Sequence, residues 1–207
     1  MSSNQTPCTI FIVDDDEAVR DSLRWLLEAN GYQVKCFAAA EDFLQHYDPE
    51  HIGVLIVDVR MPGMSGLELQ EALVARKATI PMVFITGHGD VPMAVNTMKK
   101  GAVDFLEKPF NEADLRAIVA RMIEQAIQTA SQTAVYRHHE KALSRLTARE
   151  EQVLERIVAG RLNKQIAGDL DISIKTVEAH RANIMEKLEV TTVADLMKIA
   201  LAKPGEN

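Results

Sequence analysis

Cysteine, long apolar runs and a signal sequence are what this chain most clearly lacks. Its cysteines are Cys8 and Cys36, two in 207 residues, too few for a disulfide-rich scaffold and without the Cys/His spacing of a zinc site. We interpret both as buried, reduced thiols; a disulfide between them is the less favoured alternative. No apolar stretch approaches the roughly 20 residues that a membrane span needs, and residues 1–7 carry neither a basic region nor an apolar signal core. These absences predict a cytoplasmic protein that does not associate with membranes.

Positive charge is scarce in the first part of the chain. Residues 1–125 contain 11 Lys and Arg against 19 Asp and Glu, a net charge of −8, whereas residues 126–207 contain 12 against 11, a net charge of +1. We expect the first part to repel nucleic acid. The second part is nearly neutral, so it can bind nucleic acid through a local basic patch.

Glycine and proline are absent from residues 111–159. Apolar residues keep a helical spacing from Leu115 to Ala134, which predicts one long helix that begins in the first domain and continues as a linker. This apolar spacing extends beyond what one domain can bury and so favours a partner helix. A simple spacer whose apolar face fades after Ile127 explains the pattern equally well.

Two apolar runs end directly in carboxylates. Residues 53–57 lead into Asp58 and then a Pro/Gly-rich segment, and residues 9–13 lead into Asp14-Asp15-Asp16-Glu17. Such runs are typical of strands buried on both faces of a parallel sheet. In these sheets the ligand-binding and reactive residues lie just beyond the carboxyl ends of the strands. Three or four carboxylates in one pocket repel one another, so the pattern predicts a bound cation. The alternative is that the acids after residue 13 only cap the first helix.

Strand and helix patterns alternate through the first 125 residues. The predicted strands cover residues 9–13, 33–37, 53–57, 80–85 and 103–106. The predicted helices cover residues 17–27, 39–47, 66–76 and 92–100, followed by the long helix. Strands that are each followed by a helix require a parallel sheet with right-handed crossovers.

The last part of the chain contains four short helical patterns. The first opens at a capping box between Thr147 and Glu150, and a tight turn at 171–173 joins the second to the third in helix-turn-helix geometry. We therefore predict an α/β fold, a flavodoxin-like (βα)5 doubly wound parallel sheet at residues 1–125. A helical linker at 126–144 would join it to an all-α four-helix helix-turn-helix domain at 145–207.

These motifs resemble a known family over nearly the whole chain. Residues 9–125 resemble a two-component receiver domain through Asp14-Asp15, Asp58 with Met61-Pro62-Gly63-Met64-Ser65-Gly66, Thr86-Gly87, and Phe105 followed by Lys108-Pro109. Residues 145–203 resemble the LuxR-type output domain through Leu146-Thr147, Arg149-Glu150, Asn163-Lys164 and Lys175-Thr176-Val177-Glu178-Ala179-His180-Arg181. Together they resemble the FixJ branch of response regulators, which includes regulators of aromatic-hydrocarbon breakdown.

This resemblance implies a phosphorylation site and a metal. Asp58 would accept a phosphoryl group from a sensor histidine kinase. Asp15, Asp58 and the backbone carbonyl of Arg60 would ligate Mg²⁺, and Asp14 would hold a metal-bound water. Arg60 and His88 stand two residues after Asp58 and Thr86 and flank the pocket, and we predict that their side chains affect the phosphoryl lifetime by obstructing water.

The resemblance also implies a switch. Lys108 would pair with one phosphoryl oxygen, aimed inward by a cis peptide before Pro109. Thr86 would donate its hydroxyl to another oxygen, and its movement toward Asp58 would let Phe105 turn inward. The face formed by helix 92–100 and strand 103–106 would then pair with a second copy of the chain.

The output domain would bind promoter DNA as part of that homodimer. The candidates for contact with DNA phosphates are Lys164, Lys175, Thr176, Arg181 and Asn183, and those for contact with base edges are Glu178, Ala179 and Ala182. The resemblance implies a transcription regulator, by family habit an activator acting with RNA polymerase, and it suggests an aromatic-hydrocarbon catabolic operon as the target.

Two other interpretations use the same residues differently. A phosphatase of the haloacid dehalogenase type needs a second acid two residues after its nucleophile, and Arg60 stands at that position, so we do not expect an enzyme. A DNA-binding regulator that works without phosphorylation, with a receiver-like dimerisation platform, is the alternative that stays open.

Overall fold

The computed structural model describes residues 8–87 and 91–201. The chain divides into two compact units between Ala130 and Ser131, inside the longest helix. Among the described residues, no helix is both long and apolar enough to cross a lipid bilayer.

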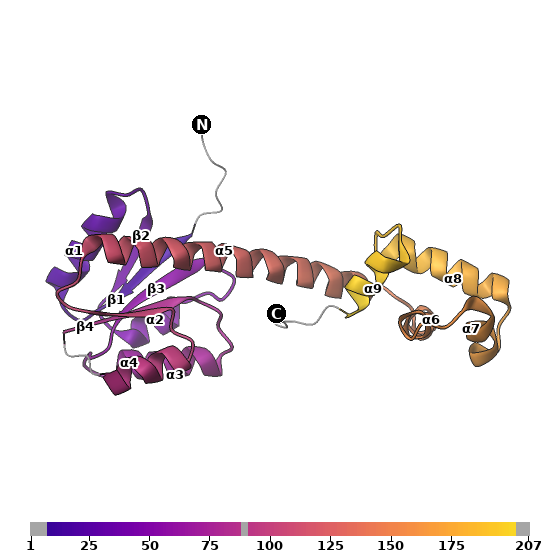
Figure 1. Ribbon diagram of the computed structural model, residues 1–207, viewed down its shortest axis with the longest axis horizontal. Helices are drawn as coiled ribbons and strands as arrows, with labels where there is room; N and C mark the ends of the chain where they lie inside the picture. The colour runs from indigo at the N-terminus through magenta and orange to yellow at the C-terminus, as the bar shows by residue number, and fades with distance from the viewer. Residues whose placement is uncertain (1–7, 88–90, 202–207) are drawn as a thin grey trace. The chain divides into compact units, whose positions relative to one another are not determined.

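The first unit is the predicted doubly wound α/β fold (Figure 1). Its strands are β1 (Thr9–Val13), β2 (Gln33–Phe37), β3 (Gly53–Asp58), β4 (Met82–Thr86) and β5 (Asp104–Glu107). Its helices are α1 (Glu17–Glu28), α2 (Ala40–His46), α3 (Gly66–Ala75), α4 (Val91–Lys99) and α5 (Glu112–Leu143). All strands pair in parallel in the order β2-β1-β3-β4-β5, which confirms the flavodoxin-like topology.

Alternating side chains of the central strands serve two separate cores. In β1, Ile10 and Ile12 pack in a cluster with residues of α1 and α5, such as Leu27. Phe11 and Val13 pack on the opposite face in a cluster with residues of α2 and α3, and Figure 1 shows α4 beside α3 on that face. Both faces of the central strands are therefore buried, as their unbroken apolar sequence predicts.

The predicted element boundaries hold to within one or two residues. The sequence predicts the fourth strand at 80–85, and the strand forms at Met82–Thr86. Pro81 has no N–H for the ladder, and Thr86 continues the pairing by facing Glu107. The fifth strand is likewise shifted by one residue, to Asp104–Glu107.

The strand register excludes a disulfide between the two cysteines of this chain. Cys36 lies opposite Ile12 in the β1–β2 pair, four residues along from Cys8. At about 3.3 Å per residue this separates the two by roughly 13 Å, well beyond the reach of a disulfide. Both are free thiols, and burial raises the pKa of Cys8 to about 11.

Helix α5 is continuous through the predicted linker and ends at Leu143. Its buried positions from Leu115 to Ala126 belong to the core of the first unit, and Ala142 near its end belongs to the core of the second. Residues 131–135 are all exposed, an arrangement that both a partner helix and a simple spacer would give in a single chain.

The second unit packs the remaining helices around one small core. These are α6 (Ala148–Val158), α7 (Asn163–Leu170), α8 (Ile174–Lys187) and α9 (Val193–Leu201). Asp171 adopts a left-handed conformation between α7 and α8, with φ of 52°, and Ser173 caps α8 by accepting a hydrogen bond from the N–H of Thr176. The core contains Val153, Ile166, Val177, Ile184 and Leu196.

Candidate functional site

The candidate site lies where the central strands end. Asp14 follows β1, Asp58 ends β3, Thr86 ends β4, and Lys108 follows β5. Because the strands are parallel and adjacent in the order β1-β3-β4-β5, these four residues meet at the carboxyl edge of the sheet. This is the edge at which open α/β sheets place their ligands.

Lys108 joins two buried carboxylates at this edge. Its Nζ lies 2.8 Å from Asp14 Oδ2 and 3.0 Å from Asp58 Oδ1. Asp14 is 3% exposed and Asp58 is 7% exposed, whereas the Lys108 side chain is 24% exposed. Two buried negative charges thus share one lysine cation that reaches in from the surface.

This arrangement shifts two pKa values. Burial raises the pKa of Asp14, and that effect exceeds the opposing effect of its hydrogen bond from Lys108. Burial alone would lower the pKa of Lys108, but its hydrogen bonds to Asp14 and Asp58 bring the pKa above the ordinary lysine value. Lys108 is therefore protonated and positively charged at neutral pH. Its single positive charge does not balance the two carboxylate charges of Asp14 and Asp58, so the pocket favours a further cation.

The acidic run after β1 divides into different roles. Asp16 is the N-cap of α1 and accepts hydrogen bonds from the N–H groups of Ala18 and Val19. Its own N–H donates to Asp14 Oδ1 at 2.9 Å, and Asp15 is exposed. Asp14 and Asp58 are the buried carboxylates of this pocket, Asp15 lies at its surface, and the expected fourth carboxylate, Asp16, serves the helix instead.

The chemistry of the donor atoms in this pocket decides which metal ion it suits. Within residues 8–87 and 91–201, no three or more His, Cys, Asp or Glu side chains converge in the manner of a metal site; the cation between Asp14 and Asp58 here is Lys108. All the donors expected from the sequence are carboxylate or carbonyl oxygens, which suit Mg²⁺ and disfavour softer metals. The residues present fit a magnesium ion.

Arg20 is a neighbour that the sequence did not point to. From α1, its Nη1 donates to the carbonyl oxygens of Asp14 at 2.7 Å and Asp15 at 2.9 Å. It therefore fixes the backbone of the turn that carries both acids. An arginine in the first turns of an amphipathic helix gives no signal of such a contact, which depends on how the turn folds back.

The loop after β3 approaches Asp58 closely. The N–H of Arg60 donates to Asp58 Oδ2 at 2.7 Å, while the Arg60 side chain is exposed. A Cβ added to Gly66 would collide with the carbonyl oxygen of Asp58, so only glycine allows α3 to begin so near the strand. His88, expected to flank the pocket with Arg60, lies outside the described residues.

The remaining predicted switch residues lie beside this pocket. Thr86 is 1% exposed, and its carbonyl oxygen accepts a hydrogen bond from the N–H of Lys108 at 2.8 Å. The Lys108–Pro109 peptide is cis, as expected. Phe105 is half-buried, opposite Phe84 in the β4–β5 pair.

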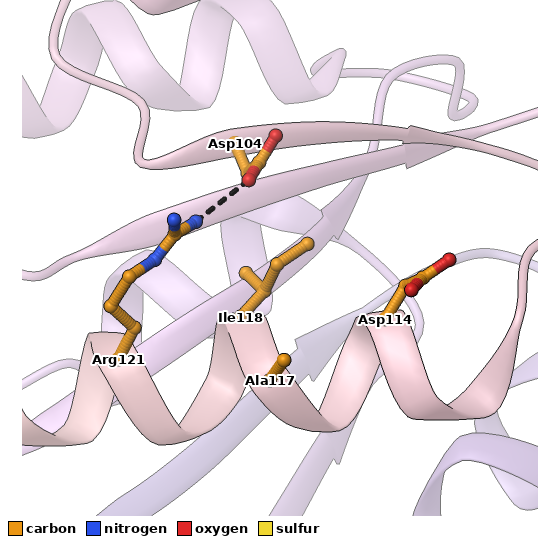
Figure 2. A pocket seen from close by; sticks show the side chains of 5 residues that line it. All are labelled: Asp104, Asp114, Ala117, Ile118 and Arg121. Carbon is orange, nitrogen blue, oxygen red and sulfur yellow. Dashed lines mark hydrogen bonds and ion pairs between the residues drawn. The ribbon is translucent and has the colours of Figure 1, made fainter.

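A separate hollow lies between β5 and α5 (Figure 2). It encloses about 350 Å³ and is lined by Asp104, Asp114, Ala117, Ile118 and Arg121. Arg121 Nη2 lies 2.7 Å from Asp104 Oδ2 across it, so its one basic side chain is already paired. It adds nothing to the carboxylate pocket.

The helix-turn-helix places most of its candidate residues on the surface. Those exposed are Lys164, Lys175, Thr176, Glu178, Ala179, Ala182 and Asn183. Arg181, also expected to be exposed, is half-buried, because it lies four residues after Val177 and three before Ile184, at the edge of the buried face of α8. The Thr176 hydroxyl is already within 2.7 Å of the capping Ser173 Oγ.

A buried ion pair fastens the end of α8 to the start of α6. Glu150 is 3% exposed, and Lys187 Nζ lies 2.7 Å from its Oε2. The hydrogen bond from Lys187, followed by the one from the N–H of Thr147, lowers the pKa of Glu150 to about 2. The capping box predicted from the sequence is present, but no sequence pattern indicates the part played by Lys187.

This pair should make the second unit sensitive to acid. The folded-state pKa of Glu150 is depressed, so its stabilisation is present above its unfolded value of about 4.3 and is lost as pH falls toward about 2. In urea unfolding of the full chain followed by circular dichroism, the stability difference between wild type and Glu150→Gln should shrink over that range. A difference that stays constant with pH would show that the ionised carboxylate contributes nothing.

Comparisons with known proteins cover both units. A family model described as "Response regulator receiver domain" matches residues 10–120, and one described as "Bacterial regulatory proteins, luxR family" matches residues 144–200. The transcriptional regulatory protein FixJ of Rhizobium meliloti (strain 1021) is 47% identical over 197 residues, covering 95% of this chain and 97% of that protein. The response regulator protein TodT of Pseudomonas putida is 44% identical over 190 residues, covering 92% and 84%.

Solved structures give the same match over the full length. A low-resolution structure of the response regulator StyR is 46% identical, with a TM-score of 0.85, covering 94% of this chain and 98% of that one. The first unit alone matches a crystal structure titled FixJ-N at 50% identity and a TM-score of 0.54, covering 58% and 96%.

Proposed function

Because the chain belongs to the FixJ-type two-component response regulators, with a receiver domain followed by a LuxR-type DNA-binding domain, we propose that Asp58 is its phosphorylation switch. A sensor histidine kinase is the donor, and phosphorylation promotes dimerisation and promoter binding. The observation that carries this proposal is the Asp14–Lys108–Asp58 constellation at the carboxyl edge of the sheet. The receiver would span residues 1–125, the linker 126–144 and the output domain 145–207.

The transfer step is a displacement at phosphorus. An Asp58 carboxylate oxygen attacks the phosphohistidine, a P–O bond forms, the P–N bond breaks, and the leaving imidazole nitrogen keeps the electron pair and takes a proton from solvent. Lys108 Nζ, now 3.0 Å from Asp58 Oδ1, pairs with a phosphoryl oxygen. Thr86 donates its hydroxyl to another.

Receiver domains bind Mg²⁺ at the phosphorylation site, and we assign Asp15, Asp58 and the Arg60 carbonyl as its ligands, with Asp14 holding a metal-bound water. When bound, the ion neutralises the carboxylates and the phosphoryl oxygens. A bound ion would supply the positive charge that Lys108 alone does not provide beside Asp14 and Asp58.

Phosphorylation then biases a two-state element. Thr86 moves toward Asp58, Phe105 turns inward, and the face formed by α4 and β5 pairs with a second copy. The half-buried position of Phe105 leaves part of its ring available for this burial.

Dimerisation brings two helix-turn-helix modules onto paired half-sites. Lys164, Lys175, Thr176, Arg181 and Asn183 contact phosphates, and Glu178, Ala179 and Ala182 face base edges. One module binds weakly, because residues 126–207 carry a net charge of only +1. The regulator activates transcription with RNA polymerase, with an aromatic-hydrocarbon catabolic operon as the first target to test.

Light scattering tests this coupling on wild type and Asp58→Asn, each with and without beryllofluoride and Mg²⁺. Wild type should double its mass from 23.0 kDa only when both are present, and Asp58→Asn should stay monomeric. A dimer under every condition would favour the phosphorylation-independent regulator. A monomer under every condition would point to pairing on DNA and contradict the proposed switch.

A further inference from the structure

The loop that links the phosphoacceptor strand to α3 is held from outside by one side chain. Glu41, in the first turn of α2, accepts a hydrogen bond at its Oε1 from the N–H of Met64 at 2.8 Å. The two residues are 23 positions apart in sequence. Glu41 is half-buried, although it belongs to a short surface helix.

Three other amide groups of this loop donate hydrogen bonds to acceptors that lie within residues 58–68. The N–H of Arg60 donates to Asp58 Oδ2, that of Ser65 donates to Glu68 Oε2 at 2.8 Å, and that of Gly66 donates to the carbonyl oxygen of Val59 at 3.1 Å. Of these four bonds, only the one to Glu41 reaches outside residues 58–68. Its loss would remove the one hydrogen bond of the four that ties the loop backbone to α2, while Val59 and Met61 keep their side chains in the core.

The approach of Glu41 to the loop is close. Gly63, next to Met64, has φ of +74°, and a Cβ added there would lie 2.8 Å from Glu41 Oε1. The loop backbone therefore adopts a conformation that favours glycine at the point where Glu41 approaches it. The hydrogen bond from Met64 and the approach to Gly63 together place the Glu41 carboxylate against the loop backbone.

We propose that Glu41 is a positioning residue for metal binding at Asp58. It acts through the loop, whose backbone at Arg60 carries the expected Mg²⁺-binding carbonyl between the anchor at Asp58 and the anchor at Met64. This inference rests on the proposed function. Removing the anchor lets the Arg60 carbonyl sample other orientations, which weakens Mg²⁺ binding, while Asp58 and Lys108 stay in place for the chemical step.

Asp42 provides a matched control. It is the next residue and the other acid in the first turn of α2, and it is exposed. Asp42→Ala removes the same charge from the same helix end without touching the loop. Glu41→Gln removes the charge but keeps an oxygen that can accept the bond from Met64, so it should restore what Glu41→Ala loses.

The experiment uses the full chain and titrates Mg²⁺ alone by calorimetry. Glu41→Ala should weaken Mg²⁺ binding on the order of tenfold, the scale on which supporting residues of metal ligands act. In the absence of Mg²⁺, the Met64 amide hydrogen of Glu41→Ala should exchange faster than that of wild type. With acetyl phosphate as donor, phosphorylation should be slower at limiting Mg²⁺ and equal to wild type at saturating Mg²⁺. Glu41→Gln and Asp42→Ala should behave as wild type.

Three outcomes of the Mg²⁺ titration would overturn the inference: unchanged Mg²⁺ affinity in Glu41→Ala, an equal loss in Asp42→Ala, or an equal loss in Glu41→Gln. The last two would assign the effect to charge. A phosphorylation defect that persists at saturating Mg²⁺ would assign Glu41 to general structure and count against positioning. If wild type itself neither binds Mg²⁺ nor takes up phosphate, the proposed function fails, and this inference fails with it.

Discussion

Replacing Lys108 with methionine should lower the thermal midpoint of the first unit by roughly 5–10 °C at neutral pH. The substitution leaves the buried carboxylates of Asp14 and Asp58 without their shared cation. Breaking a fully buried ion pair costs about 3–5 kcal/mol, and the partial exposure of Lys108 reduces this to about 2–3 kcal/mol. Scanning calorimetry of the full chain measures the change.

Two controls separate this effect from the loss of any lysine. Lys100 lies 2.6 Å from Glu71, with side chains 37% and 61% exposed, so Lys100→Met should cost well under about 1 kcal/mol. Mg²⁺ should restore part of the midpoint of Lys108→Met, because it supplies positive charge to the same carboxylates. Equal losses in the two variants, with no effect of Mg²⁺, would show that burial of the Lys108 pair contributes no stability.

Replacing Gly66 with alanine should destabilise the first unit by about 3 kcal/mol or more and sharply reduce phosphorylation of Asp58. The added Cβ would collide with the carbonyl oxygen of Asp58, and this is backbone at the end of a central strand, which cannot swing aside as a side chain does. Relief requires moving either α3 or Asp58. Urea unfolding followed by far-ultraviolet circular dichroism measures stability, and acetyl phosphate uptake measures the chemistry.

The same substitution elsewhere in the chain should have the opposite sign. Gly168 lies in α7, and a Cβ added there would meet nothing within 4 Å. Gly168→Ala should leave stability unchanged or raise it by up to roughly 1 kcal/mol, because alanine favours helix more than glycine does. If both variants destabilise equally, the contact between Gly66 and Asp58 is not the cause.

The residues that carry the chemistry were predictable because they stand at fixed places on strands. Asp58 follows an apolar run and Lys108 precedes a proline, so the sheet topology alone brings them to one edge. The alternation of strand and helix patterns likewise predicted a parallel sheet, and the flavodoxin-like order expected for it is the order that the structure has.

The residues that support the chemistry were not predictable, because their contacts arise between elements. Glu41 is one of two acids in the first turn of α2, and nothing local distinguishes it from Asp42. In the sequence Gly66 looks like part of a turn, and its closeness to the Asp58 backbone follows only from how α3 packs. Arg181 illustrates the same limit in α8. The helical period identifies the buried face of this helix, but it does not indicate how far neighbouring residues cover the edge of that face.

The pocket is formed by two parts of the chain, β3 and the loop that follows it. They differ in how much of the fold must open before their backbone is exposed to solvent. Asp58 ends β3, which is paired on both sides and buried throughout, so that half opens only when the whole unit unfolds. The loop at 59–65 exposes Arg60, Pro62 and Gly63 and has no regular secondary structure, so it is the kind of segment that opens by local fluctuation. A ligand held by both parts stabilises the closed loop while it is bound, and it is released when the loop, the part that opens more easily, opens.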